Sequence, residues 1–158
     1  MRKPWFYAVL SMVLAPLALA QHASSIDTGS WYLQTSVYTK HYSPDRRHNN
    51  NQDLIGLERI DASDWLFGAA TFRNSYSQRS HYVYAGKRYD NASYPVYIKF
   101  TGGLLEGYRG KHKDKIPLNH FGVAPVIIPS LGAHYGPVAA ELVLLGFNAA
   151  MVTTGVRF

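Results

Sequence analysis

The feature that most constrains the fold of this chain is a series of short β-branched and aromatic segments separated by turn-forming residues. The turn-forming stretches read SPDRRHNNNQD, DASD, RNSYSQRS, DNAS, RGKHKDK, YGP and GFN. Between them, strands are predicted at 30–41, 53–61, 65–73, 80–89, 94–108, 122–134, 138–146 and 149–158. Most of these segments are close to the roughly 9–11 residues with which a tilted strand crosses a bilayer. The pattern therefore favours an all-β protein of eight strands.

The connections between the segments alternate in length. The long, polar connections fall at 42–52, 74–79 and 109–121. The tight turns fall at 62–64, 90–93 and 135–137. Barrels of the outer-membrane type have short turns at one end and longer loops at the other, and the aromatic C-terminal Phe158 is typical of them. We expect an eight-stranded antiparallel transmembrane β-barrel, with a soluble lipocalin-like barrel as the alternative.

The first twenty residues predict the compartment. Two basic residues precede an apolar run from Trp5 to about Leu17, and Ala18-Leu19-Ala20 has the spacing of small residues found at cleavage sites. The run is short for a bilayer span and is interrupted by Pro16. We therefore predict a cleaved signal peptide at residues 1–20 and a single barrel domain at 21–158, exported to the outer membrane.

The composition excludes some kinds of chemistry. The sequence contains no cysteine, so neither disulfides nor thiolate catalysis are available. Without Arg2 and Lys3, 14 Lys and Arg residues face 10 Asp and Glu residues, a modest excess that suits anionic lipid as well as nucleic acid. The sequence shows no phosphate-binding loop, metal-ligand cluster or nucleic-acid motif. We expect no cofactor, no metal, no nucleic-acid partner and a monomer.

The predicted strands show an unusual face pattern. FGVAPVIIP and VAAELVLLGF are apolar on both parities, whereas a water-filled barrel requires alternation of apolar and polar residues. The interior is therefore predicted to be apolar, either as a packed core or as a pocket for a hydrocarbon chain. The many Gly and Ala residues favour the pocket because they leave room, but composition does not decide between the two.

Several motifs together resemble one known family. APVIIPSLGAHYGPV at 124–138, followed by a final strand ending in Arg157-Phe158, resembles the PagP family of outer-membrane lipid A palmitoyltransferases. TFRNSYSQ at 71–78 and KFTGGL at 99–104 are similar to motifs on that family's third and fifth strands. The resemblance implies transfer of a palmitoyl chain from a phospholipid donor to the lipid A part of lipopolysaccharide.

The resemblance also implies catalytic residues. His41, at the exit of the first predicted strand, matches the family's essential histidine, and Asn74-Ser75 fall on its Asp-Ser pair. Asn74 can donate a hydrogen bond but cannot stabilise an imidazolium by charge. Either the mechanism tolerates this, or the supporting group lies elsewhere, or activity is reduced. Ser130 is a second candidate hydroxyl, although it is expected part-way along its strand and away from the rim.

Three further positions are assigned to lipid binding. Pro125 and Pro129 lack the N–H donors of a continuous strand, and the resemblance implies that prolines of this kind leave a gap through which lipids enter sideways. Gly86 aligns with a family glycine at the floor of the acyl-chain pocket, where a side chain is expected to shorten the pocket with little effect on stability. Two other functions remain open: a lipid A or phospholipid acyl hydrolase, and a non-enzymatic barrel that binds or passes apolar molecules.

Overall fold

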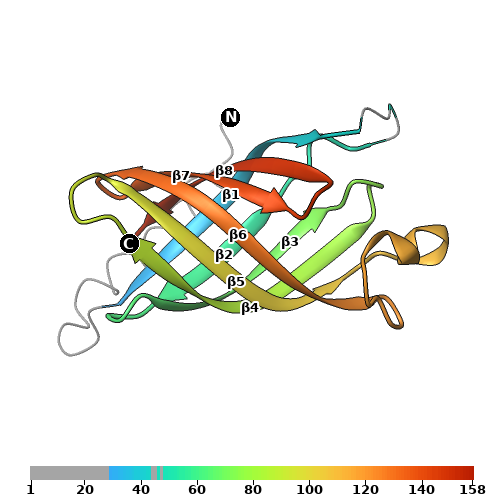
Figure 1. Cartoon of the computed structure of the whole chain (residues 1–158), viewed down its shortest axis with the longest axis horizontal. Coiled ribbons are helices and arrows are strands. Elements are labelled where there is room, and N and C mark those ends of the chain that lie inside the picture. Colours follow the sequence, from blue (N-terminus) through green and yellow to red (C-terminus); the bar gives the residue numbers. More distant parts are fainter. Residues whose placement is uncertain (1–28, 44–45, 47) are drawn as a thin grey trace, which may run out of the picture.

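Eight antiparallel strands close into one barrel in the order of the sequence (Figure 1). The computed structural model describes residues 29–43, 46 and 48–158, so the predicted signal peptide lies outside the described residues. The strands are β1 (Ser30–His41), β2 (Ile55–Ile60), β3 (Trp65–Arg73), β4 (Arg79–Asp90), β5 (Val96–Glu106), β6 (Val123–Tyr135), β7 (Val138–Leu145) and β8 (Ala149–Arg157). The predicted fold class is confirmed, and each predicted strand end lies within two residues of the observed one.

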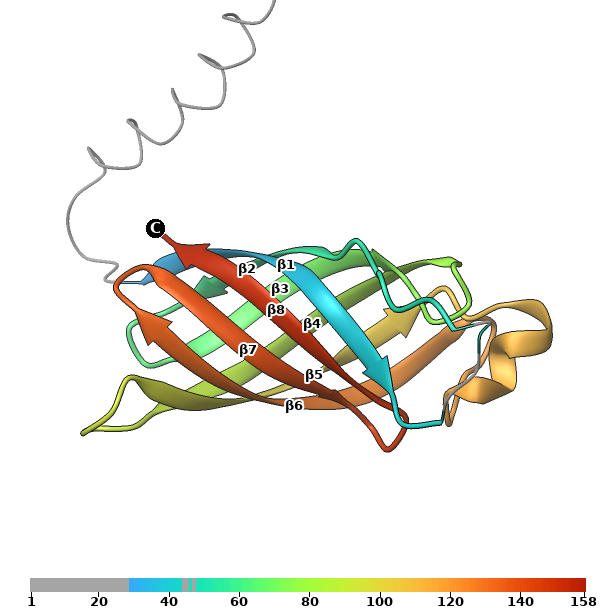
Figure 2. The same cartoon turned by 90° about the horizontal axis from the view of Figure 1, so that it is seen from above.

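The two ends of the barrel differ. The tight turns and the C-terminus lie at one end, and the longer connections lie at the other (Figures 1 and 2). The connection between β5 and β6 contains one turn-like 3-10 helix, η1 (Gly110–Lys115). Within the part of the chain that the structure describes, no helix is long and apolar enough to cross a bilayer.

The outer surface of the barrel is apolar around its circumference. Alternate residues of each strand point outward because successive side chains of a strand lie on opposite faces. Exposed apolar residues come from all eight strands: Leu33, Val37, Ile55, Leu57, Trp65, Phe67, Val83, Ile98, Phe100, Leu104, Ile127, Leu131, Leu142, Leu144, Val152 and Val156. A soluble protein rarely exposes such a large continuous apolar surface. The outward-facing side chains of the barrel are thus of the kind that soluble proteins bury.

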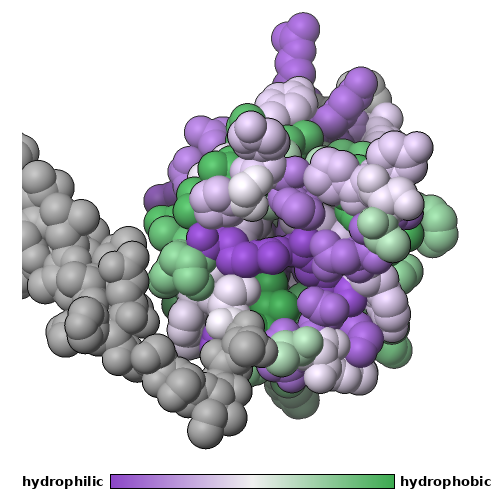
Figure 3. Space-filling model, turned by 90° about the vertical axis from the view of Figure 1, so that its left-hand side faces the viewer, coloured by the Kyte–Doolittle hydropathy of each residue, from purple (hydrophilic) through white to green (hydrophobic). Residues whose placement is uncertain are grey.

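The interior has two unlike halves, which corrects the prediction of a uniformly apolar interior. The half next to the long connections is lined by apolar side chains, including Leu54, Phe72 and Met151. The other half holds a buried ion layer, which we define as Glu58, Lys99 and Glu141. Seen from the short-turn end, hydrophilic residues cross the middle of the barrel and hydrophobic residues show mainly around its sides (Figure 3).

The glycines of the polar half do not leave empty space as expected. A Cβ at Gly132 would lie 2.2 Å from the Tyr97 ring, and one at Gly155 would lie 2.5 Å from the Tyr32 ring. Both rings are inward-facing and buried. The glycines therefore admit tyrosine rings that close this half of the barrel, whereas the open space lies in the other half.

Candidate functional site

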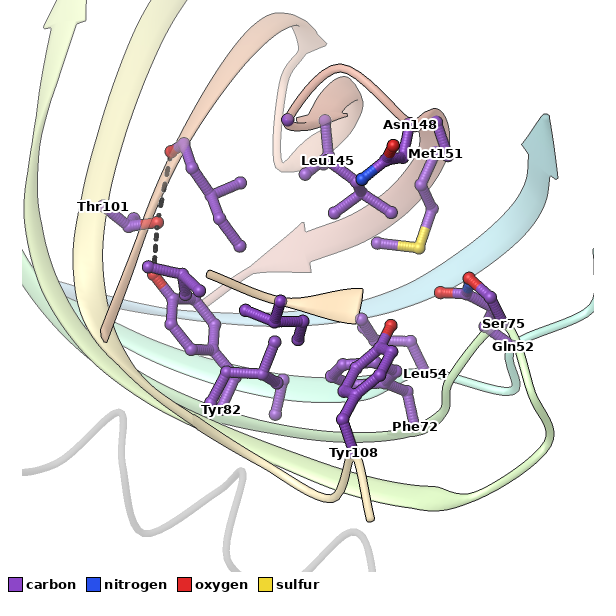
Figure 4. Close-up of a pocket in the computed structure, with 18 of the residues that line it drawn as sticks. Gln52, Leu54, Phe72, Ser75, Tyr82, Thr101, Tyr108, Leu145, Asn148 and Met151 are labelled. Carbon is purple, nitrogen blue, oxygen red and sulfur yellow. Dashed lines mark hydrogen bonds between the residues drawn. The ribbon is translucent and has the colours of Figure 1, made fainter. Parts of the chain in front are cut away.

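The apolar half of the interior contains a deep cavity that opens among the long connections. Its volume is about 1040 Å³, at the upper end of the range for small-ligand sites. Figure 4 shows Leu54, Phe72, Tyr82 and Met151 among the side chains that surround it. The Tyr82 hydroxyl donates to Thr101 Oγ1 at 3.1 Å, and Thr101 donates in turn to the Ile128 carbonyl at 3.2 Å. These two hydroxyl groups of the wall are therefore satisfied within the protein.

At the mouth of this cavity, His41 lies between Ser75 and Asn50. His41 Nδ1 is 2.9 Å from Asn50 Oδ1, and His41 Nε2 is 2.7 Å from Ser75 Oγ. Because the Asn50 oxygen can only accept, Nδ1 must carry the proton. Nε2 then has a free lone pair, which accepts the Ser75 hydroxyl proton. This is the geometry of a serine hydroxyl activated by a histidine base, with an amide in the place of an orienting carboxylate.

Backbone hydrogen bonds hold the three residues together across different connections. Asn50 accepts at its backbone carbonyl from the Thr39 N–H of β1, at 3.0 Å. Asn49 donates its backbone N–H to the Ser75 carbonyl at 2.8 Å. The β1–β2 connection is thus tied both to the end of β1, which carries His41, and to the β3–β4 turn, which carries Ser75. The site is preorganised by the main chain.

Asn74 is fully buried and builds the turn that presents Ser75. Its Oδ1 accepts from the backbone N–H groups of Tyr76 and Gln78, at 2.9 and 3.1 Å. Its Nδ2 donates to Ser80 Oγ at 3.1 Å and to the Gly107 carbonyl at 3.4 Å. A carboxylate could not make the two donations. The amide therefore suits a structural role, and the group that supports His41 is Asn50.

Aromatic side chains surround the Ser75 hydroxyl. His48 lies next to His41, with ring centroids 4.3 Å apart, and Tyr76 stacks on His112 at 3.9 Å. Burial raises the pKa of Tyr108, while hydrogen bonding with Ser75 opposes that rise. The Tyr108 hydroxyl therefore remains protonated near neutral pH and is available as a donor beside Ser75 (Figure 4).

The ion layer forms the far wall of the cavity. Lys99 Nζ lies 2.8 Å from Glu58 Oε1 and 2.8 Å from Glu141 Oε2. Glu58 also accepts from Tyr84 at 2.9 Å, and all of these side chains line the cavity. Ser130 lines it as well, in the middle of β6 and opposite Lys99 in the strand register. It is thus separate from the connections that carry His41 and Ser75.

Gly86 does not lie at the floor of the cavity, where it would have to lie to set the acyl length. It is one inward-facing position further from the long connections than Tyr84, and it does not line the cavity formed by the described residues. A Cβ there would lie 2.1 Å from the Phe100 carbonyl oxygen, which is backbone. The expectation that a side chain at this position enters open space is wrong, and the geometry assigns the floor to the ion layer.

The prolines of β6 lie beside a break in the barrel's hydrogen bonding. β6 pairs with β5 over residues 123–133 but with β7 only over 130–135. The His134 N–H donates to the Pro95 carbonyl on the β5 side, so strand alternation turns the backbone groups of Pro125 and Pro129 toward β7. The two positions without an N–H group therefore face β7, along the part of β6 that is not paired with β7.

The cavity reaches the outer surface at this break. Pro125 and Ile127 point outward and are exposed, and both also line the cavity. On the opposite strand, Val143 and Leu145 line it too. β6 and β7 diverge toward the long-connection end in both views (Figures 1 and 2). Residues on both sides of the break therefore line the cavity.

Sequence reasoning missed Asn50 and the ion layer. Asn50 is the second of three consecutive asparagines, and nothing local distinguishes it from its neighbours. The ion layer carried a usable signal, because Glu58, Lys99 and Glu141 are charged residues at inward-facing positions of otherwise apolar strands. One lysine and two glutamates at such positions predict a buried ion pair. They do not predict which of the three side chains meet.

Comparisons with known proteins leave the family open. No family model matches the sequence, and no curated protein is significantly similar to it. Among solved structures, the chain is similar to the outer membrane protein Ail of Yersinia pestis, determined in a phospholipid bilayer nanodisc. The two chains are 14% identical, the match covers 85% of this chain and 100% of that chain, and the TM-score is 0.44. A likeness of this size assigns neither a family nor an activity.

Proposed function

We propose that this protein is an outer-membrane acyltransferase of the PagP type, which moves a palmitoyl chain from a phospholipid to lipid A. The observation that carries the proposal is the 2.7 Å contact between His41 Nε2 and Ser75 Oγ at the mouth of a deep apolar cavity. An acyl chain in the cavity places its ester carbonyl near that hydroxyl. The resemblance of the surrounding motifs supports the same reaction.

In the proposed reaction, His41 Nε2 takes the proton of the Ser75 hydroxyl while Oγ attacks the ester carbonyl carbon of the donor. The bond to the glycerol oxygen breaks, and the proton passes from His41 to that oxygen, which releases a lysophospholipid. A lipid A hydroxyl then attacks the acyl group on Ser75 and gives its proton to His41. The proton returns to Ser75 Oγ as the bond to the acyl group breaks.

Membrane insertion is part of the proposal. The apolar outer surface and strands of 8 to 13 residues in seven of the eight cases suit a bilayer. Closure of the barrel leaves few backbone groups without partners in lipid. The break between β6 and β7 supports sideways entry of the donor, because Pro125 and Pro129 have no N–H to leave exposed to hydrocarbon.

The ion layer favours an enzyme over a conduit. Its three charged side chains, with Tyr84 and Tyr97, join strands across the barrel below the cavity. A molecule that enters from the long-connection end meets this polar wall. An apolar cavity that is closed at its far wall and has a reactive pair at its mouth suits holding a chain during a reaction better than passing it through the barrel.

The test is a mass spectrum of lipid A from cells with and without the protein. We expect a gain of one palmitoyl unit, and a loss of at least about 100-fold in transfer rate for Ser75→Ala and His41→Ala. Ser130→Ala is the matched control, because it removes a hydroxyl from the same cavity away from His41 and should keep transfer. Release of free fatty acid, with lipid A either unchanged or lacking an acyl chain, would assign a hydrolase instead. Unchanged lipid A without release would favour a binding barrel.

A further inference from the structure

Basic side chains of the β5–β6 connection stand at the mouth of the cavity. Lys111 and Lys115, both on η1, line the same cavity as His41 and Ser75. Lys113, between them, instead lines a separate surface hollow. Two lysines of this short segment thus border the cavity, and the third borders the hollow.

This segment is fastened at several points. Asn119 Nδ2 donates to the Tyr108 carbonyl at 3.0 Å and to the Lys113 carbonyl at 2.8 Å. The His112 ring stacks on Tyr76, which follows Ser75, with an interplanar angle of 13°. The segment therefore keeps a fixed relation to the serine. Cations held on such a segment lose less freedom on binding an anion than cations on a loose loop do.

The two lysines have no carboxylate of their own. Lys111 and Lys115 are exposed, and neither forms an ion pair with any residue that the structure describes. Arg109, by contrast, is paired with Glu106. The carboxylates that line the cavity belong to the ion layer at its far wall. The segment's own carboxylate, Asp114, lines the separate hollow. The mouth therefore carries uncompensated positive charge.

We propose that Lys111 and Lys115 bind the phosphate of the phospholipid whose acyl chain occupies the cavity. The inference rests on the proposed function and adds to it a binding site for the donor headgroup. Ile116, Pro117 and Leu118 follow directly and line the same mouth, so an apolar wall adjoins the cations. A phospholipid has this order of groups, with its phosphate one glycerol away from the ester. Ammonium groups bind phosphate through charge-assisted hydrogen bonds.

The test measures binding without chemistry. The probe is a phosphatidylglycerol with ether-linked chains, which has no ester to transfer, and its partner is the matched ether-linked diglyceride without phosphate. Both are titrated into the full barrel refolded in an uncharged maltoside detergent. For Lys111→Gln/Lys115→Gln we expect about tenfold weaker binding of the phospholipid and unchanged binding of the diglyceride. Lys113→Gln is the matched control and should bind both lipids as the wild type does.

Several results would overturn the assignment. These are equal binding of the phospholipid by the double variant and the wild type, an equal loss for the diglyceride, or no phospholipid binding by the wild type. Displacement of the probe by millimolar inorganic phosphate would identify a site for a free anion rather than a headgroup. Because the probe cannot react, weaker binding by the double variant supports the site even if lipid A proves to be unmodified. If lipid A is palmitoylated but the double variant binds the phospholipid as the wild type does, the proposed function stands and the proposed headgroup site is wrong.

Discussion

Removing the cation of the ion layer should strongly destabilise the barrel. The side chains of Lys99, Glu58 and Glu141 are 5, 1 and 2% exposed, and one ammonium lies 2.8 Å from an oxygen of each carboxylate. Lys99→Met keeps most of the length of the side chain but leaves two buried carboxylates without a cation. Breaking a buried pair by removing one partner costs about 3–5 kcal/mol. Since this lysine serves two carboxylates, we expect a loss at the upper end, about 5 kcal/mol.

The assay is equilibrium unfolding by denaturant in lipid vesicles, followed by the fluorescence of Trp31 and Trp65. Lys87→Met is the control, because Lys87 lies on the same outer face as Trp65, with its ammonium 4.9 Å from that ring. It should cost no more than about 1 kcal/mol. A deficit below about 1 kcal/mol for Lys99→Met would refute the reasoning.

Three other substitutions test the cavity and the reactive pair. Gly86→Ala should lower the free energy of unfolding by about 1–3 kcal/mol, because its Cβ would lie 2.1 Å from the Phe100 carbonyl, and should leave the preferred acyl length unchanged in assays with a donor series. Ser130→Met, which fills the cavity beside the ion layer, should shorten the preferred chain, with about 0.8 kcal/mol lost per excluded methylene; an unmoved optimum would contradict this floor. Asn50→Asp keeps an acceptor oxygen for His41 Nδ1 and should retain transfer; a loss of transfer would contradict the orienting role of that oxygen.

The strands were predictable because the signals that define them are local. The residues that end one strand and begin the next are neighbours in the sequence, and β3 (Trp65–Arg73) was predicted with both ends correct. Because neighbouring strands run in opposite directions, the first and third strands also end at the same end of a barrel. His41 and Ser75 could therefore be expected at one rim, and the structure places them 2.7 Å apart. Their catalytic roles stay predictions.

The contacts that shape the site depend on how far the strands are displaced as the barrel closes. That displacement brings Glu58 of β2, Lys99 of β5 and Glu141 of β7 to one level, and it leaves Gly86 beyond the cavity. It also turns Asn50, from a connection without regular structure, toward His41. The sequence by itself determined which residues form strands and at which end of the barrel the long connections lie. Only the tertiary structure decided which inward side chains meet, because their contacts join strands that are distant along the chain.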